Sequence, residues 1–325
     1  MRKSLLAATL LVASLLQAQE ASLLIVPRWK VGDSRTLDVT QVTHEDKAGT
    51  TGDDRTMQHI VVRVVNEDPK AYILRMQCDN PIVGAVTKLG GTPGQGLDPF
   101  KQVMLRYSVS KYDGRPHLEN WEEVQKFMRK SFDVTMASLK QDTAAVAAAG
   151  LLLLPVMDVF KSREGVEEYF SEVINYVTFP FGKRIADNDT LKATSYCRNP
   201  FNPTGNDSIP VRALTHVQQI DRLQQQAVVR RVERTDFSAF VDLMKGMMRQ
   251  SMASAKVTPA DRKRAEAKME AELKGMRFDM DTEALYTMDL LSTWPLAVKS
   301  TVRMTATSGS TAMLTTTTTD VTVTK

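Results

Sequence analysis

Polar and apolar residues alternate in several stretches before residue 112, which is the pattern of β-strands with one buried face. These stretches are SRTLDVTQV (34–42), TMQHIVVRVV (56–65), AYILRMQC (71–78) and QVMLRYSVSKY (102–112). Between them, THEDKAGTTGDD (43–54) and LGGTPGQGLDPF (89–100) predict loops, and DGRP (113–116) predicts a turn. The first third of the chain is therefore predicted to be an antiparallel meander.

The period of the apolar positions changes near residue 119. Asn120 precedes Trp121, Val124, Phe127 and Met128 at helical spacing, and Glu123 completes a capping-box pattern with Asn120 in the cap position. Helical sequence continues to about residue 177 and returns at 236–275. We expect an α+β fold in which an antiparallel, curved β-sheet packs against these two helical segments, 119–177 and 236–275.

The C-terminal region returns to strand patterning. AVKSTVRMTAT (297–307) and TAMLTTTTTDVTVTK (311–325) flank a short turn that contains glycine, as a hairpin requires. Threonine is β-branched and favours strands. Val321 and Val323 fall on one face and Thr322 and Thr324 on the other, so the threonine run is predicted to be a terminal strand with one wet face.

The first eighteen residues have the layout of a secretory signal peptide. Arg2 and Lys3 precede an apolar run from Leu5 to Leu16 that is too short for a stable membrane anchor, and Ala18 precedes a switch to polar sequence. We expect residues 19–325 to form one exported domain, with a subdivision near 179–210 left open. No cysteine lies near the cleavage site, so a periplasmic or secreted protein without a lipid anchor or a transmembrane segment is predicted.

Charge excludes some partners. The net charge of +4 falls to +2 without residues 1–18, because these contain two basic residues and no acidic one. A chain so balanced lacks the concentrated basic face that binding to nucleic acid or to an anionic membrane requires. The two cysteines, Cys78 and Cys197, could form a disulfide in an oxidising compartment, but their spacing does not show proximity. The alternative for Cys78 is a buried free thiol.

No motif of a known catalytic or phosphate-binding site occurs, so we expect no enzyme, no cofactor and no metal site. FDMDTE places Asp279, Asp281 and Glu283 on one strand face, which is more typical of a solvated face than of a calcium site. His117 and Asp113 could form an acid–base pair, although the Asp-Gly turn explains Asp113 without catalysis.

The most suggestive segment is AAVAAAGLLLLPVM (144–157), which has no polar side chain and must be buried if it is helical. Leu151, Leu152, Leu153 and Leu154, together with Met244 and Met248 from a methionine stripe at helical spacing, are the candidate residues for an apolar site. A packed core without a ligand is the alternative. Two hypotheses follow: a non-enzymatic carrier of a lipid or another apolar ligand, or a structural or interaction protein of the cell envelope.

The chain also resembles uncharacterised exported bacterial families. The resemblance rests on RWKVGDSRTLDV, on YSVSKYDGRPHLENWEEV and on the closing FDMDTEAL and TTTTTDVTVTK. It implies a β-rich envelope protein and assigns no functional residue. The order of strands, helices and strands is also similar to that of periplasmic proteins that carry lipids or lipoproteins on a curved sheet, which is an analogy of architecture.

Overall fold

The computed structural model describes residues 22–47, 50–88, 95–138, 153, 157–186, 190–198, 208–237, 264, 276–308 and 311–325. Within this part of the chain, strands dominate, and one antiparallel sheet contains eleven of them in the order β6-β5-β4-β3-β2-β13-β12-β11-β10-β9-β8. The sheet does not close into a barrel. A separate pair is formed by β1 (Ser22–Leu24) and β7 (Arg184–Ala186).

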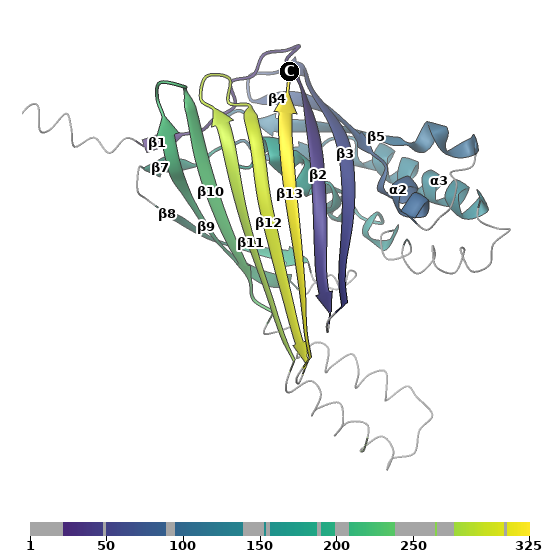
Figure 1. The fold of residues 1–325 in the computed structure, drawn as a ribbon. Coiled ribbons are helices and arrows are strands. Elements are labelled where there is room, and N and C mark those ends of the chain that lie inside the picture. The colour runs from purple at the N-terminus through teal and green to yellow at the C-terminus, as the bar shows by residue number, and fades with distance from the viewer. Residues whose placement is uncertain are drawn as a thin grey trace, which may run out of the picture.

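All strands of the large sheet except the short β6 are long, and the bounds are as follows: β2 Ser34–Lys47, β3 Thr50–Glu67, β4 Ala71–Asp79, β5 Gln102–Ser110, β6 Pro116–Leu118, β8 Thr190–Arg198, β9 Ser208–Asp221, β10 Gln226–Thr235, β11 Arg277–Asp289, β12 Pro295–Ser308 and β13 Thr311–Thr324. The described helices are α2 (Pro81–Lys88), a 3₁₀ turn η1 (Gln95–Phe100), α3 (Trp121–Ser138), α5 (Arg163–Tyr169) and α6 (Ser171–Thr178). Figure 1 shows the strands side by side, with α2 and α3 beyond β5.

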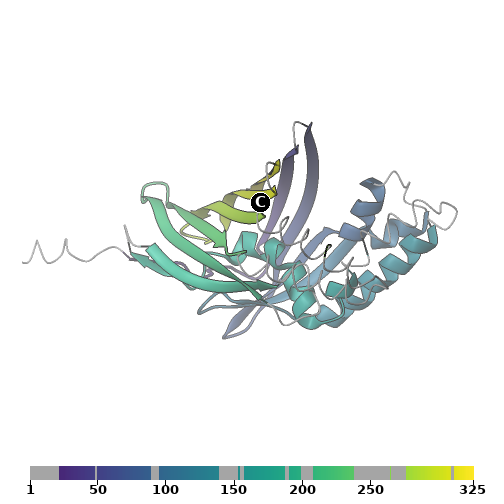
Figure 2. The ribbon, with the colours of Figure 1, turned by 90° about the horizontal axis from the view of Figure 1, so that it is seen from below.

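The sheet is curved, and its concave side carries the core (Figure 2). Each strand contributes every second residue to this side, for example Leu74, Met76 and Cys78 of β4, which are completely buried. The helical segment α5–α6 supplies the opposite layer through Val166, Phe170 and other buried side chains. The expected antiparallel sheet is present, and the described helices of the segment 119–177, α3, α5 and α6, lie against it, in a fold dominated by strands.

The threonine-rich strand β13 lies in the middle of the sheet, between β12 and β2. Val321 is 2 % exposed and Val323 packs against the main core, as the alternation predicts. Thr319 on the same face is buried, and the hydroxyl groups of Thr317 and Thr43 form a hydrogen bond of 3.1 Å across the β13–β2 pair. The run is thus a strand, as predicted, and it is a central one.

The RWKVG segment enters the sheet through an aromatic cluster. Trp29 is 3 % exposed, and its ring lies 4.8 Å from that of Trp294, 5.2 Å from that of Phe181 and 5.5 Å from that of Tyr72. Gly32 follows with φ of 95° and donates its N–H to the carbonyl of Val64. This positive φ explains the glycine, because other residues rarely adopt it.

One sequence prediction was wrong, and two stretches contain elements that the sequence patterns did not indicate. Residues 43–54, predicted to be a loop, belong almost entirely to β2 and β3, and their described side chains are exposed except for the half-buried Thr43, so neither face is apolar. The segment PIVGAVTK, without any predicted element, forms α2. Residues 179–210, where a subdivision was left open, contain β7 and β8 and the start of β9. Of the predicted helical segment 236–275, almost all lies outside the described residues.

Candidate functional site

A cavity of about 1030 Å³ opens between the concave side of the sheet and the helices. Its walls come from four places: the exposed half of β3, the junction of β4 with α2, the residue after η1, and the junction of α5 with α6. The lining residues are Arg55, Thr56, Met57, Gln58, Asp79, Asn80, Pro81, Val83, Gly84, Lys101, Tyr169, Phe170, Glu172 and Val173. The cavity therefore depends on the tertiary fold and on no single motif.

Asn80 fixes one wall. Its side chain is 2 % exposed and donates to the carbonyl of Phe100 and to the hydroxyl of Ser131, each at 2.8 Å. Its amide oxygen accepts the N–H of Ile82 at 3.0 Å, which is the geometry of a helix N-cap. One buried amide thus starts α2 and joins it to η1 and to α3. Because buried amides are costly when unsatisfied, this network holds α2 in place.

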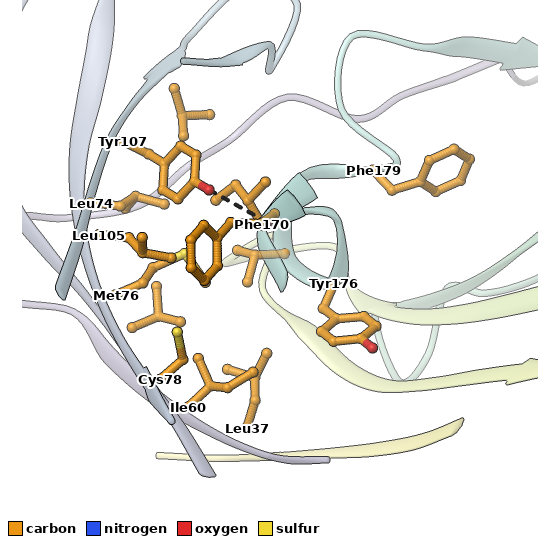
Figure 3. Close-up of a cluster of buried hydrophobic side chains, with 14 of the residues drawn as sticks. Leu37, Ile60, Leu74, Met76, Cys78, Leu105, Tyr107, Phe170, Tyr176 and Phe179 are labelled. Atoms are coloured by element: carbon orange, nitrogen blue, oxygen red, sulfur yellow. Dashed lines mark hydrogen bonds between the residues drawn. The ribbon is translucent and has the colours of Figure 1, made fainter. Parts of the chain in front are cut away.

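The junction of α5 and α6 forms the opposite wall. Ser162 caps α5 by accepting the N–H of Gly165 at 3.1 Å. Phe170, between the two helices, projects onto β4 and β5, and Figure 3 shows its ring beside Met76 and Leu105. The hydroxyl of Tyr107 donates to the carbonyl of Phe170 at 3.4 Å. These contacts join the helical wall to the sheet.

Tyr169 at this wall has an apolar environment. Its ring lies 4.9 Å from that of Phe160 and 5.1 Å from that of Phe170. Burial raises the pKa of Tyr169 to about 12, and the nearby Cys78 acts in the same direction. Tyr169 is therefore neutral at physiological pH and contributes an apolar ring with one polar atom.

Charged side chains occur only at the rim of the described lining. Arg55 and Lys101 are cationic, Asp79 and Glu172 are anionic, and all four are exposed. The Lys101 amine forms an ion pair with Asp98 at 2.7 Å. The buried lining residues, by contrast, are Val83, Phe170 and Asn80, and the amide of Asn80 is fully engaged by its hydrogen bonds within the protein. A mixed rim above an apolar interior suits an amphiphile better than an ion.

Of the six residues predicted to form an apolar site, the structure describes Leu153 alone. Leu153 is 2 % exposed and belongs to the main hydrophobic core, and it is absent from the described lining of the cavity. Leu151, Leu152, Leu154, Met244 and Met248 lie outside the described residues. Sequence reasoning missed the lining residues, because they come from segments that are adjacent only in the folded protein.

Cys78 is a free thiol with no exposed surface, on the concave side of β4. Burial raises its pKa to about 12, so it stays protonated. The backbone of Cys197 lies in β8, at the end of the sheet, and seven strands separate β8 from β4 in the strand order. The structure thus shows the buried free thiol for Cys78 rather than the disulfide.

The polar candidates are surface features. Glu283 pairs with Arg230 at 2.7 Å and Asp281 with Arg234 at 3.4 Å, so the acidic face of β11 is a solvated face with cross-strand ion pairs. His117 lies 3.3 Å from Glu167 and not beside Asp113, whose carboxylate accepts the N–H of Arg115 at 3.2 Å within the turn.

Comparison with known proteins gives no family. No family model matches the chain, and no curated protein matches it. Seven chains of solved structures match. Two of them are the attachment invasion locus protein Ail of Yersinia pestis (5 % identity, 91 % of this chain and 100 % of that chain, TM-score 0.14) and an outer membrane channel from Pseudomonas putida F1 (6 % identity, 92 % and 98 %, TM-score 0.17).

These TM-scores are far below the level at which two proteins share a fold, so neither structure informs the function. In the described part of the chain, no helix combines the length and the hydrophobicity needed to cross a membrane. The candidate functional site is accordingly the cavity between α2, β3 and the α5–α6 junction.

Proposed function

We propose that the protein is an exported, non-enzymatic binding module that carries an apolar ligand, such as the acyl chain of an amphiphile, in the cavity. The observation that supports the proposal is the cavity of about 1030 Å³, which has an apolar interior between Phe170 and Val83 and a charged rim. This volume is at the upper end of the range for small-molecule sites in proteins. Export is proposed from the signal-like residues 1–18.

The arrangement of the walls supports a carrier. The cavity lies between a rigid sheet and helices, so an acyl chain can be shielded from water while a polar headgroup stays at the rim. Shielding apolar surface from water is favourable by about 25 cal/mol per Å². The rim contains both signs of charge, Arg55 and Lys101 against Asp79 and Glu172, and so does not select an anionic over a zwitterionic headgroup.

Gly84 provides a sharp test. It lies in α2 and lines the cavity, and a Cβ added there would meet no atom within 4 Å. A Gly84→Trp change should therefore fill part of the cavity without disturbing the fold. We expect weaker binding of a fluorescent fatty acid to this variant, by about tenfold or more for the lost volume. The matched control is Gly84→Ala, which removes a helix-destabilising glycine but fills little space and should bind as the wild type does.

Native mass spectrometry of the protein purified from its own envelope provides a second measurement, in which a co-purifying amphiphile is expected. Wild-type protein that binds no fatty-acid probe and carries no amphiphile would argue against the carrier. Equal probe affinity of the Gly84→Trp and Gly84→Ala variants would show that any probe binds elsewhere.

A further inference from the structure

Two adjacent turns at one end of the sheet expose leucine side chains. The turn between β9 and β10 contains Leu223, which is 99 % exposed, and the turn between β11 and β12 contains Leu291, which is 65 % exposed. The turns touch, because the N–H of Leu290 donates to the carbonyl of Gln225 at 2.8 Å. Both hairpins end at the upper edge in Figure 1.

Neither turn needs a leucine for its geometry. Asp221 accepts the N–H groups of Leu223 and Gln224 through one carboxylate oxygen, each at 2.9 Å. Asp289 likewise accepts the N–H of Leu291 at 2.9 Å. Aspartates that bond to the backbone two or three residues ahead define such turns, whatever side chain projects from the tip. A large apolar side chain at the tip therefore calls for a different explanation.

A third exposed apolar side chain lies at the same end. The segment that leads into β2 reaches the β11–β12 turn, where the N–H of Arg28 donates to the hydroxyl of Thr293 at 2.9 Å. Val31, three residues later, is 55 % exposed. The strand register agrees, because Thr36 at the start of β2 pairs with Thr324, and Ala297 near the start of β12 pairs with Thr322.

The charges at this end are arranged with the cations outward. Arg28, Lys30 and Arg222 are exposed, and none of the three forms an ion pair with a described residue. The carboxylates nearby are only partly exposed and accept N–H groups of their own turns: Asp33 accepts that of Lys30 at 2.9 Å, as Asp221 and Asp289 do in theirs. The outer surface thus combines apolar tips with cations that form no ion pair among the described residues, a local arrangement that the balanced net charge of the whole chain does not reveal.

We propose that this end of the sheet docks on the surface of a bilayer that contains anionic lipids, with Leu223 and Leu291 inserted at the level of the headgroups. Apolar side chains that project singly from turns match a fluid phase, which flows around them, better than a rigid protein surface, which would need a pocket for each. Arg28, Lys30 and Arg222 supply the attraction to anionic headgroups. The proposal does not rest on the cavity, which lies at the other end of β3 and β4.

The experiment is co-sedimentation of the purified protein with unilamellar vesicles of phosphatidylcholine and phosphatidylglycerol, free of protein. The tip variant is the double change Leu223→Ser and Leu291→Ser. Its control is the double change Leu214→Ser and Leu314→Ser, since these leucines, 41 % and 40 % exposed, lie away from the tips in β9 and β13. We expect the tip variant to bind about tenfold more weakly than the wild type, and the control to bind as the wild type does.

A charge variant separates the contribution of the cations to membrane binding from that of the leucine side chains. The changes Arg28→Gln and Arg222→Gln, which leave Lys30 in place, should lower binding to vesicles with phosphatidylglycerol and should weaken its salt dependence. Three outcomes would overturn the proposal: no sedimentation of the wild type with vesicles, equal loss in the tip and control variants, or binding to native envelope membranes but not to protein-free vesicles. The last outcome would indicate a protein partner. Thermal melts of each variant verify folding, and binding of the soluble fatty-acid probe to the tip variant should be unchanged.

Discussion

Gly114 lies against Phe181 so closely that a Cβ at position 114 would be 1.9 Å from the Cβ of Phe181. The contact is reciprocal, because a Cβ at Gly182 would lie 2.2 Å from the carbonyl oxygen of Asp113. Both glycines have positive φ, 65° and 72°. The turn after β5 and the segment after α6 are thus interlocked through two glycines, and this contact ties the helical layer to the sheet.

Gly114→Ala should therefore destabilise the protein more than Gly32→Ala. Gly32 has φ of 95° but open space around it, so alanine there suffers only backbone strain, about 1–2 kcal/mol. At Gly114 the strain is joined by a collision with Phe181, and we expect a loss of about 3 kcal/mol or more. Urea denaturation of both variants gives the comparison. Equal losses of unfolding free energy in the two variants would mean that the structure around Gly114 adjusts to the added methyl group without further cost.

Leu153→Ala should cost about 2–5 kcal/mol of the free energy of unfolding, because Leu153 is 2 % exposed in the main core and the truncated site would be left as a cavity. Leu223→Ala is the matched control and should be nearly neutral, since that side chain is 99 % exposed. Chemical denaturation measures both. A loss below about 1 kcal/mol for Leu153→Ala would return Leu153 to the ligand-contacting residues expected from the sequence.

Cys78 should resist thiol reagents in the native state. It has no exposed surface, and its pKa is raised to about 12, so little reactive thiolate forms at neutral pH. In a Cys197→Ser variant, which leaves Cys78 as the only cysteine, a maleimide should react only after denaturant is added. The labelled fraction is read by intact mass. Rapid labelling without denaturant would contradict the burial of Cys78, and a wild-type mass two hydrogens low would indicate a disulfide after all.

Lys183 should make stability depend on alkaline pH. Burial, and then the nearby Arg231, lower the pKa of Lys183 to about 8 from its ordinary 10.5. Between these two values the unfolded chain binds more protons than the folded one, so this group makes stability rise with pH across that window. Below pH 8 Lys183 is protonated in both states, and its burial then destabilises the folded protein in full.

Lys183→Met removes the titrating amine and should therefore flatten this dependence. The difference in unfolding free energy between variant and wild type should shrink by on the order of 2 kcal/mol from pH 8 to pH 10.5, with allowance for residual exposure. Tyrosine ionisation is common to both proteins and cancels in the difference. Parallel stability curves would show that Lys183 keeps an ordinary pKa.

Local patterns predicted the strands well wherever one face is buried. Val321 and Val323 alternate with threonines, and β-branching favours the strand, so β13 could be predicted from local sequence alone. The central position of β13 in the sheet could not be predicted, because its partner β2 is distant in sequence and no local signal specifies the pairing. The ends of β2 and β3 that form their hairpin, residues 43–54, were missed for the opposite reason. Neither face is apolar there, and Gly52 and Asp53 resemble loop residues.

The start of α2 shows why the cavity was not predictable. PIVGAVTK is rich in β-branched residues, and its helical form depends on Asn80, which is held in turn by Phe100 and Ser131 from distant segments. Lining residues such as Gly84 and Val173 carry no pattern of their own. Their common role exists only once the sheet and helices have packed.

The pairing of β2 with β13 has a consequence for how the chain folds. Thr36 meets Thr324, so the middle seam of the sheet joins residues at nearly the largest sequence separation that the chain offers. Such non-local contacts slow folding, because the entropy of closing a very long loop must be overcome before the seam forms. Until then the inner edge of β2 stays unpaired and can recruit other strands. A nascent chain cannot complete its sheet before its last strand emerges, and it should depend on protection from aggregation until that moment.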